Sequence, residues 1–257
     1  MSYETDLTDS QWEIVAEILE DGRKRQHSLQ IVVSAIFYVT KTGVQWRNLP
    51  RDYPKWQLIY YYFRKWSKSG LIDKIHQLLY EKVRVGEKRA VSPSLGLIDS
   101  QSVKTASVTE LKGLDANKKI NGRKRFIVTD TLGWIIGLMV VAASVQERAG
   151  AEKLFVLMKG KYPRLEKVLA DQGFDGEEFT ARIRKTFGFV LEIVKKVLGV
   201  SGFQVLPKRW VVERTFGWLM FNRRLVKDYE VKTEHSESFI QMAMIRLMLR
   251  KLSPRKI

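Results

Sequence analysis

The spacing of apolar residues changes once along this 257-residue chain, in the segment 86–93. Before that segment, apolar residues recur every three or four positions, which is the period of helices with one buried face. After it, short apolar runs of strand length alternate with helical segments, which is typical of a mixed sheet flanked by helices. We therefore predict an all-helical region over residues 1–85 and a single α/β domain, with a C-terminal helix, over residues 86–257.

The first region should contain helices joined by short connections. A capping box formed by Thr8 and Gln11 predicts the start of the first helix. Further helices are expected over residues 29–40, 55–68 and 71–83. Such a bundle is similar to the helix-turn-helix, which places one helix in a DNA groove.

One of these helices, residues 55–68, has two chemically different sides. One side carries Trp56, Ile59, Tyr60, Phe63 and Trp66. Aromatic stripes at helical spacing usually face the core, so we expect the tryptophans Trp12, Trp56 and Trp66 to be buried. The other side is basic. We expect Arg64, Lys65 and Lys68 to contact DNA.

The second region carries the elements of a mixed sheet. Strands are expected over residues 95–98, 123–130, 134–141, 165–170 and 189–194. Helices are expected over residues 151–159, 179–187, 209–222 and 239–252. Strands interleaved with helices in this order predict a sheet covered by helices.

The chain is strongly basic, with 45 Lys and Arg against 28 Asp and Glu and a net charge of +17. The excess is +4 over residues 1–98, +6 over 99–170 and +7 over 171–257, so no basic tail accounts for it. Such a surface attracts polyanions, and nucleic acid or an anionic membrane is the expected partner. The alternative is a basic surface that serves solubility alone.

Other classes of protein are excluded by composition. The absence of cysteine rules out disulfides, Cys-ligated zinc, iron–sulfur clusters and thiol catalysis. The acidic N-terminal segment does not resemble a signal peptide. The longest apolar run, residues 132–143, is shorter than the roughly 20 residues that span a bilayer. We therefore expect a cytoplasmic protein without a membrane partner.

Three carboxylates stand at positions that suit a site. Asp99 and Asp171 each follow an apolar strand, and ligands bind beyond the carboxyl ends of strands in open α/β sheets. Glu213 lies among arginines on a predicted helix, where a plain surface ion pair is the alternative. Carboxylate oxygens suit Mg²⁺ or Mn²⁺, and two such ions about 4 Å apart can clamp the oxygens of a phosphoryl transfer.

Several stretches resemble the DDE transposases of bacterial insertion sequences, in the insertion-sequence-five group. The matching stretches are LIDSQSVKT, GRKRFIVTDTLG, LADQGFDG and RWVVERTFGWL, with QWEIVAEIL, GVQWRNLP and FRKWSKSGL in the helical region. The resemblance implies a ribonuclease-H-like sheet. It also implies that Asp99, Asp171 and Glu213 are catalytic ligands of two Mg²⁺ ions, for which Mn²⁺ can substitute.

The same resemblance extends to the DNA-binding residues. Arg209 matches the arginine of the signature Y-x2-R-x3-E-x6-K, whereas Leu206 and Met220 stand in place of its tyrosine and lysine. Arg223 or Arg224 is expected to replace that lysine. The residues expected to contact DNA are Arg64, Lys65, Lys68, Lys104, Arg123, Lys124, Arg125, Arg209, Arg223 and Arg224.

The resemblance implies a bacterial transposase, located in the cytoplasm at the nucleoid. Such a protein binds the terminal inverted repeats of its own element, cleaves the ends and joins the 3′-hydroxyls to target DNA, and we expect a homodimer on double-stranded DNA. The alternative from a different class is a non-catalytic DNA-binding regulator derived from a transposase. A ribonuclease acting on an RNA–DNA hybrid would share the metal site but leaves the N-terminal helices without a role.

Overall fold

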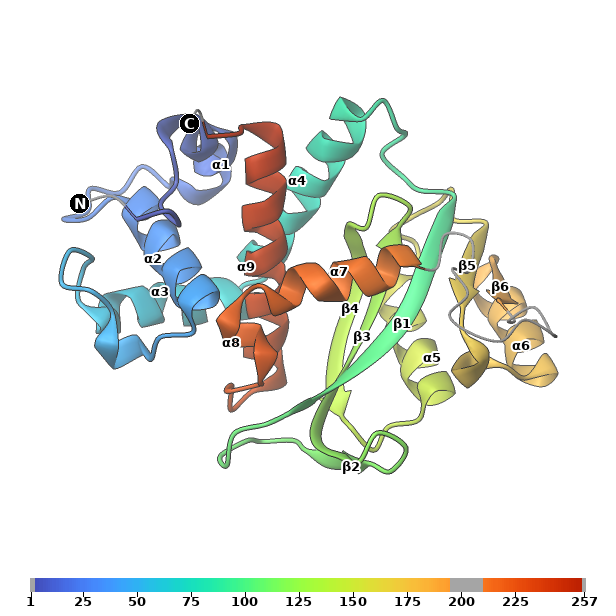
Figure 1. Ribbon diagram of the computed structural model, residues 1–257. Coiled ribbons are helices and arrows are strands. Elements are labelled where there is room, and N and C mark those ends of the chain that lie inside the picture. Colours follow the sequence, from blue (N-terminus) through green and yellow to red (C-terminus); the bar gives the residue numbers. More distant parts are fainter. Residues whose placement is uncertain (1–2, 195–209, 256–257) are drawn as a thin grey trace. The chain divides into compact units, whose positions relative to one another are not determined.

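The computed structural model describes residues 3–194 and 210–255, and it divides into two compact units. One unit combines Met1–Arg89 with Leu219–Ile257, and the other is Ala90–Trp218. The expected α/β domain over 86–257 therefore differs from the unit observed, because the last segment of the chain packs with the N-terminal helices. Figure 1 labels the helices and strands of both units.

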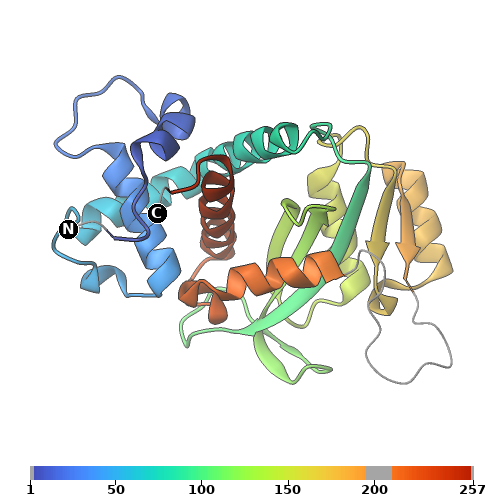
Figure 2. The same cartoon turned by 45° about the horizontal axis from the view of Figure 1, so that its top comes forward.

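The helical unit is built from elements at both ends of the sequence. They are α1 (Asp9–Leu19), α2 (Leu29–Thr42), the 3-10 turn η1 (Trp46–Asn48), α3 (Trp56–Lys68), α4 (Leu71–Gly86), α8 (Arg223–Val226) and α9 (Thr233–Leu252). The capping box expected at Thr8 is present, with the side chains and backbones of Thr8 and Gln11 bonded reciprocally. Figure 2 shows α9 between α4 and the helices that precede it in the sequence.

Helix α9 explains why the C-terminal segment belongs to this unit. It contacts α4 most extensively and also packs on α2 and α3. Its aromatic residue Phe239 is fully buried and packs against Phe63 of α3, with ring centroids 4.5 Å apart. The apolar faces of the first four helices are thus closed by a helix that lies far from them in the sequence.

The expectation that three tryptophans are buried is correct for one of them. Trp66 is buried on α3 beside Ile59 and Phe63. Trp12 and Trp56 are partly exposed instead. Trp56 is the first residue of α3, where the helix has no preceding turn to cover the ring.

The sheet unit contains the strands and the helices that cover them. They are β1 (Leu95–Lys104), β2 (Gly113–Asp115), β3 (Ile120–Asp130), β4 (Ile135–Ala142), α5 (Glu147–Met158), β5 (Lys167–Ala170), the 3-10 turn η2 (Gln172–Phe174), α6 (Glu177–Phe187), β6 (Val190–Ile193) and α7 (Trp210–Met220).

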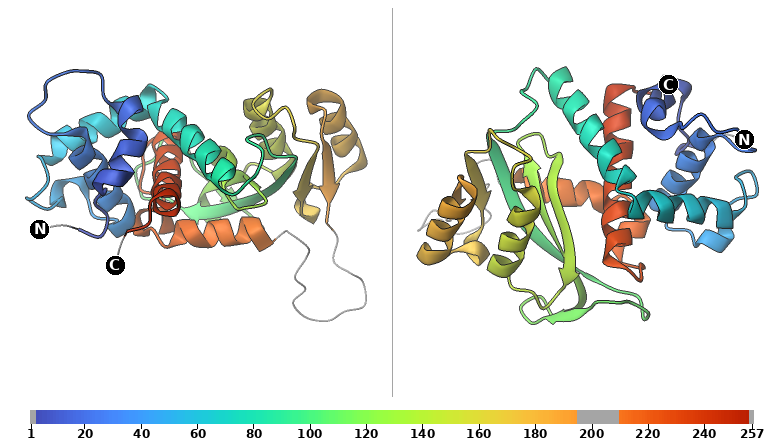
Figure 3. Two further views of the ribbon diagram at one scale, coloured as in Figure 1. Left: turned by 90° about the horizontal axis from the view of Figure 1, so that it is seen from above. Right: turned by 180° about the vertical axis from the view of Figure 1, so that it is seen from behind.

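These strands form one mixed sheet in the order β2-β3-β1-β5-β6, with β4 paired to β3. Strand β3 is antiparallel to both β1 and β4, whereas β5 is parallel to both β1 and β6. Helices α5 and α7 lie on opposite faces of this sheet (Figure 3). The fold is therefore the ribonuclease-H-like mixed sheet flanked by helices that the sequence predicted.

Close packing fixes α5 on its face of the sheet. Gly150 of α5 lies so near the ring of Phe126 on β3 that a Cβ atom would overlap the ring. Both residues are buried. Within residues 3–194 and 210–255, no helix has the length and hydropathy needed to cross a membrane.

Candidate active site and nucleic-acid interface

Two of the predicted carboxylates lie on neighbouring parallel strands or directly after one of them. Strands β1 and β5 run parallel, and their last paired residues are Leu97 and Leu169. Asp99 and Asp171 each lie two residues beyond that pair, so continuing the register places them opposite one another. Asp99 lies within β1, which extends to Lys104 because it pairs with β3 along nine residue positions. The strand predicted to end at Ile98 is thus longer than expected.

The side chain of Asp99 belongs to the sheet face opposite α5. Ser100 donates a hydrogen bond from Oγ to Oε1 of Glu147, on α5, at 3.5 Å. Because successive side chains in a strand alternate between faces, Asp99 is directed to the other face. Its Oδ1 accepts a hydrogen bond from the backbone N–H of Ser100 at 2.7 Å.

The turn that carries Asp171 is also fixed by its own carboxylate. Asp171 caps η2, and its Oδ1 accepts a hydrogen bond from the backbone N–H of Gly173 at 2.9 Å. Both aspartates are only partly buried. Each therefore uses one oxygen to hold local backbone while remaining accessible to a ligand.

Helix α7 carries the third carboxylate and lies on the face to which Asp99 is directed (Figure 3). Arg214 donates to the carbonyl of Leu132 and Thr215 to that of Gly133, each at 2.8 Å. The rings of Trp134 and Trp218 also meet, with centroids 5.6 Å apart. These contacts fasten α7 to the turn between β3 and β4.

Glu213 lies in the first turn of α7 and is exposed. The N-terminal end of this helix lies in front of β1 (Figure 1). Among the residues described, however, no three acidic or histidine side chains lie close enough to share a metal ion. The structure therefore places Asp99 and Asp171 on neighbouring segments of the sheet unit and Glu213 on a helix that covers the sheet, but it does not bring the three carboxylates together as a metal site.

The donor chemistry of the paired aspartates fits a divalent cation. Asp99, within β1, and Asp171, directly after β5, offer hard oxygen ligands. Mg²⁺ binds such ligands through one or two carboxylates plus water and phosphate oxygens. With the protein's phosphate-attracting charge, this arrangement suits phosphoryl transfer more than a structural metal site.

A buried charged network supports β1 from the α5 side, and sequence reasoning missed it. Nζ of Lys124 lies 2.9 Å from Oε1 of Glu147 and 3.5 Å from Oδ2 of Asp115. Asp115 also accepts a hydrogen bond from Ser102 at 2.6 Å. Burial raises the pKa of Asp115, but the hydrogen bonds from Ser102 and Lys118 and the charge of Lys124 outweigh it and leave the pKa lowered.

The expectation that the basic run on β3 contacts DNA is wrong. The side chains of Arg123, Lys124 and Arg125 are 0%, 3% and 1% exposed. They lie on β3, which has β1 on one side, β4 on the other, and a helix on each face, so almost none of their surface can reach a phosphate. Arg123 instead donates from Nε to the carbonyl of Leu111 at 3.0 Å. The basic run is part of the interior.

Arg224 is a second correction. Its guanidinium is buried and pairs with Glu230, with Nη2 2.6 Å from Oε1, and it lies over the ring of Phe239. The neighbouring Arg223 is exposed, as is Lys104, so both keep a surface that DNA could contact. Arg209 and Leu206 lie outside the described residues.

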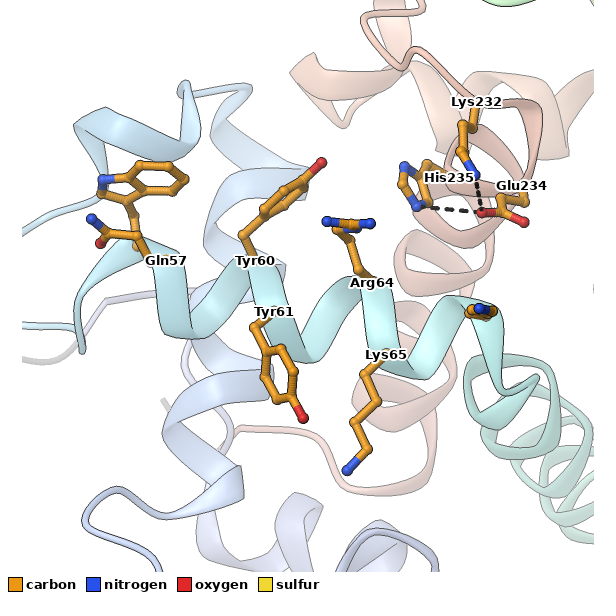
Figure 4. Close-up of a pocket in the computed structure, with 10 residues that line it drawn as sticks. Gln57, Tyr60, Tyr61, Arg64, Lys65, Lys232, Glu234 and His235 are labelled. Carbon is orange, nitrogen blue, oxygen red and sulfur yellow. Dashed lines mark ion pairs between the residues drawn. The ribbon is translucent and has the colours of Figure 1, made fainter.

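The predicted basic face of α3 is exposed as expected. Arg64, Lys65 and Lys68 are all exposed, and they line a groove between α3 and the start of α9 (Figure 4). Trp56 and Tyr60 line the same groove. Helical periodicity predicts that these aromatic residues are buried, whereas Trp56 and Tyr60 are partly exposed. The sequence signal that could have indicated exposure is the position of Trp56 at the first residue of the helix.

Comparison with known families agrees with this fold. Residues 91–249, more than half of the chain, match the family described as "Transposase DDE domain". Residues 7–76 match the family described as "Putative transposase of IS4/5 family". The chain belongs to the DDE transposases of IS4/5-type insertion elements, as the sequence motifs indicated.

A relative of this chain is the "Insertion element IS402 uncharacterized 16.2 kDa protein" of Burkholderia cepacia. The two are 24% identical, and the alignment covers 42% of this chain and 78% of the relative.

Proposed function

We propose that this protein binds the terminal inverted repeats of its own insertion sequence, cleaves DNA at the element ends and joins the 3′-hydroxyl ends to target DNA. The observation that supports the proposal is that Asp99 and Asp171 each lie two residues beyond Leu97 and Leu169, the last paired residues of the parallel strands β1 and β5. Family membership supports transposition as the overall process.

Asp99 and Asp171 would together hold Mg²⁺, and Glu213 would complete the site from α7. The bound metal supplies charge stabilisation and activation of the attacking oxygen, first of water and then of the 3′-hydroxyl. The chain's own residues position the ligands. Ser100 and Gly173 orient the two aspartates through backbone N–H groups, and Arg214 with Thr215 holds the helix that carries Glu213.

DNA would be held by exposed cations rather than by the buried run on β3. Arg64, Lys65 and Lys68 on α3 are proposed to contact the terminal repeats, and Lys104 and Arg223 to contact phosphates. Because phosphate contacts position a protein without reading sequence, recognition of the repeat requires base contacts from the helical unit. Two element ends must be brought together, so a homodimer on DNA in the bacterial cytoplasm is proposed.

The proposal is tested by incubating the full-length protein with Mg²⁺ and a duplex that carries the element's terminal repeat. The repeat is identified by sequencing the DNA that flanks the gene. Nicks at the element end and joined strand-transfer products are expected with this duplex and not with a scrambled one. A protein that binds the repeat but produces neither nicks nor joined strands would instead be a DNA-binding regulator.

A further inference from the structure

A groove of about 650 Å³ lies on the helical unit between α3 and the start of α9. We call it the α3–α9 groove. Its lining residues are Trp56, Gln57, Tyr60, Tyr61, Arg64, Lys65, Lys68, Lys232, Glu234 and His235. The groove is lined by residues of one compact unit only.

The groove is electrostatically suited to an anion. Four cationic side chains, of which three lie on α3 and one is Lys232, line it against a single carboxylate, Glu234. That carboxylate is already engaged, at 3.6 Å from Nζ of Lys232 and 3.7 Å from Nε2 of His235. The α3 cations therefore remain available to an incoming phosphate.

The groove also has an aromatic wall, formed by the rings of Trp56 and Tyr60, which the binding of a phosphate group alone would not require. Tyr60 is supported from within by Trp46, with ring centroids 5.3 Å apart, and the guanidinium of Arg64 lies 5.7 Å from its centroid. Figure 4 shows Tyr60 and Arg64 projecting from α3 toward the side on which His235 and Lys232 lie. Trp56 and Tyr60 are both partly exposed.

Aromatic rings beside cations are the features that bind unpaired nucleotides. Bases stack on the rings, and every base can do so, while the cations hold the backbone. A paired duplex cannot use such a wall in the same way, because its bases are stacked on one another and present only their edges and phosphates. A DNA strand with an unstacked base can bind both the aromatic rings and the cations of the groove.

We infer that the α3–α9 groove binds an unpaired nucleotide of a DNA strand. Its base stacks on Trp56 and Tyr60, and its phosphates contact Arg64, Lys68 and Lys232. The inference rests on the proposed function in that DNA is the ligand, and it extends that function by naming single-stranded DNA as what this surface takes. Such nucleotides arise wherever a strand is nicked or an end is freed.

The test measures binding of the full-length protein to a fluorescently labelled oligothymidylate and to a blunt duplex, by anisotropy at fixed salt. EDTA is present, so that cleavage plays no part and a failure here is distinct from a failure of the catalytic proposal. The groove variants are Trp56→Leu, Tyr60→Leu and Arg64→Ala. Leucine retains apolar volume against the surrounding side chains while removing the aromatic face.

Matched controls lie on the same unit outside the groove. Lys24→Ala removes an exposed cation, and Phe221→Leu removes an aromatic side chain that is 72% exposed. Circular dichroism and thermal melting of every variant show that folding is retained. Tyr61→Leu, at a ring that is 55% exposed, provides a groove variant with little structural cost should Tyr60→Leu fail to fold.

Each groove variant at an aromatic position should weaken binding of the oligothymidylate about tenfold, within the range measured for base stacking. Its affinity for the duplex should change far less, and the two controls should leave the preference between the ligands unchanged. Equal losses for single strand and duplex in Trp56→Leu or Tyr60→Leu would overturn the inference. Tighter binding of an acidic peptide of matched charge than of the oligothymidylate would overturn it as well.

Discussion

Asp99 and Asp171 each lie two residues past Leu97 and Leu169, the last paired residues of the parallel strands β1 and β5. The two residues are 72 positions apart in the sequence. The parallel pairing of β1 with β5 is what places these two segments next to one another. Both carboxylates also bond local backbone N–H groups, which fixes their orientation before any ligand arrives.

Adjacent arginines on α8 should respond in opposite ways to substitution. Arg224→Met removes one partner of a buried ion pair and should destabilise the protein by about 3–5 kcal/mol, because Glu230 is left buried and unpaired. Arg223→Ala changes an exposed residue and should alter the free energy of unfolding by less than about 0.5 kcal/mol while weakening DNA binding. Urea unfolding and DNA titration of both variants check this. Equal destabilisation would contradict the different roles assigned to the two residues.

Two glycines in helices of the sheet unit should also respond in opposite ways to substitution by alanine. Gly150→Ala should destabilise the protein by about 1–3 kcal/mol, since the new methyl group overlaps the Phe126 ring in a packed interior. Gly217→Ala meets open space within α7 and should stabilise it by about 0.5–1 kcal/mol through reduced chain entropy. Thermal unfolding measures both. A neutral Gly150→Ala would show that α5 does not pack on β3 as described.

His76 should make the stability of the helical unit depend on pH. Burial lowers its pKa from 6.5 to about 4, with Asp73 opposing the shift, and within the described residues its Nε2 has no hydrogen-bond partner. As pH falls from 7, the unfolded state takes up the proton first, so stability present above about pH 6.5 is lost as pH falls toward 4. The loss between pH 7 and pH 5 should be about 2 kcal/mol.

The matching control is His76→Leu, which removes the titrating group and keeps the site apolar. Its unfolding free energy should fall less between pH 7 and pH 5 than that of the unaltered protein. The same pH dependence in both proteins would assign it to other groups.

DNA binding should depend steeply on salt, because the positive charge is spread along the chain. Six to ten phosphate contacts would give a slope of log K against log salt of roughly −5 to −9. Arg64→Ala should reduce the magnitude of this slope by about 1, whereas the buried Arg125 contributes nothing to it. An affinity for the element ends that barely changes with salt would contradict this account.

The fold was largely predictable from the sequence, and the site only in part. Apolar periodicity located the helices and strands, and the acids that follow strands identified Asp99 and Asp171. Burial of Arg123 and Arg125 was not predictable, because a basic run typically marks a surface and only the sheet order makes β3 central. The pairing of α9 with α4 is a long-range contact that local patterns do not encode.

That long-range contact also decides how DNA recognition should be tested. Deleting residues 1–85 would remove the helices against which α9 is buried and expose its apolar face. Loss of binding by the truncated chain would then report unfolding rather than recognition. Substitutions at Arg64, Lys65 and Lys68 in the full chain test the same assignment without this difficulty.

The most direct test of the account is cleavage of a terminal-repeat duplex in Mg²⁺ by Asp99→Asn and Asp171→Asn, with Asp175→Asn as the control from the same loop. Asparagine keeps the oxygen that accepts from Ser100 or Gly173, so the local backbone is retained while the charge is lost. Each of the two variants should lose at least about 100-fold in cleavage rate, comparable with the removal of a major transition-state stabiliser, and still bind the duplex. The control should cleave normally. Near-normal cleavage by either Asp99→Asn or Asp171→Asn would contradict the pairing of these residues as the catalytic centre.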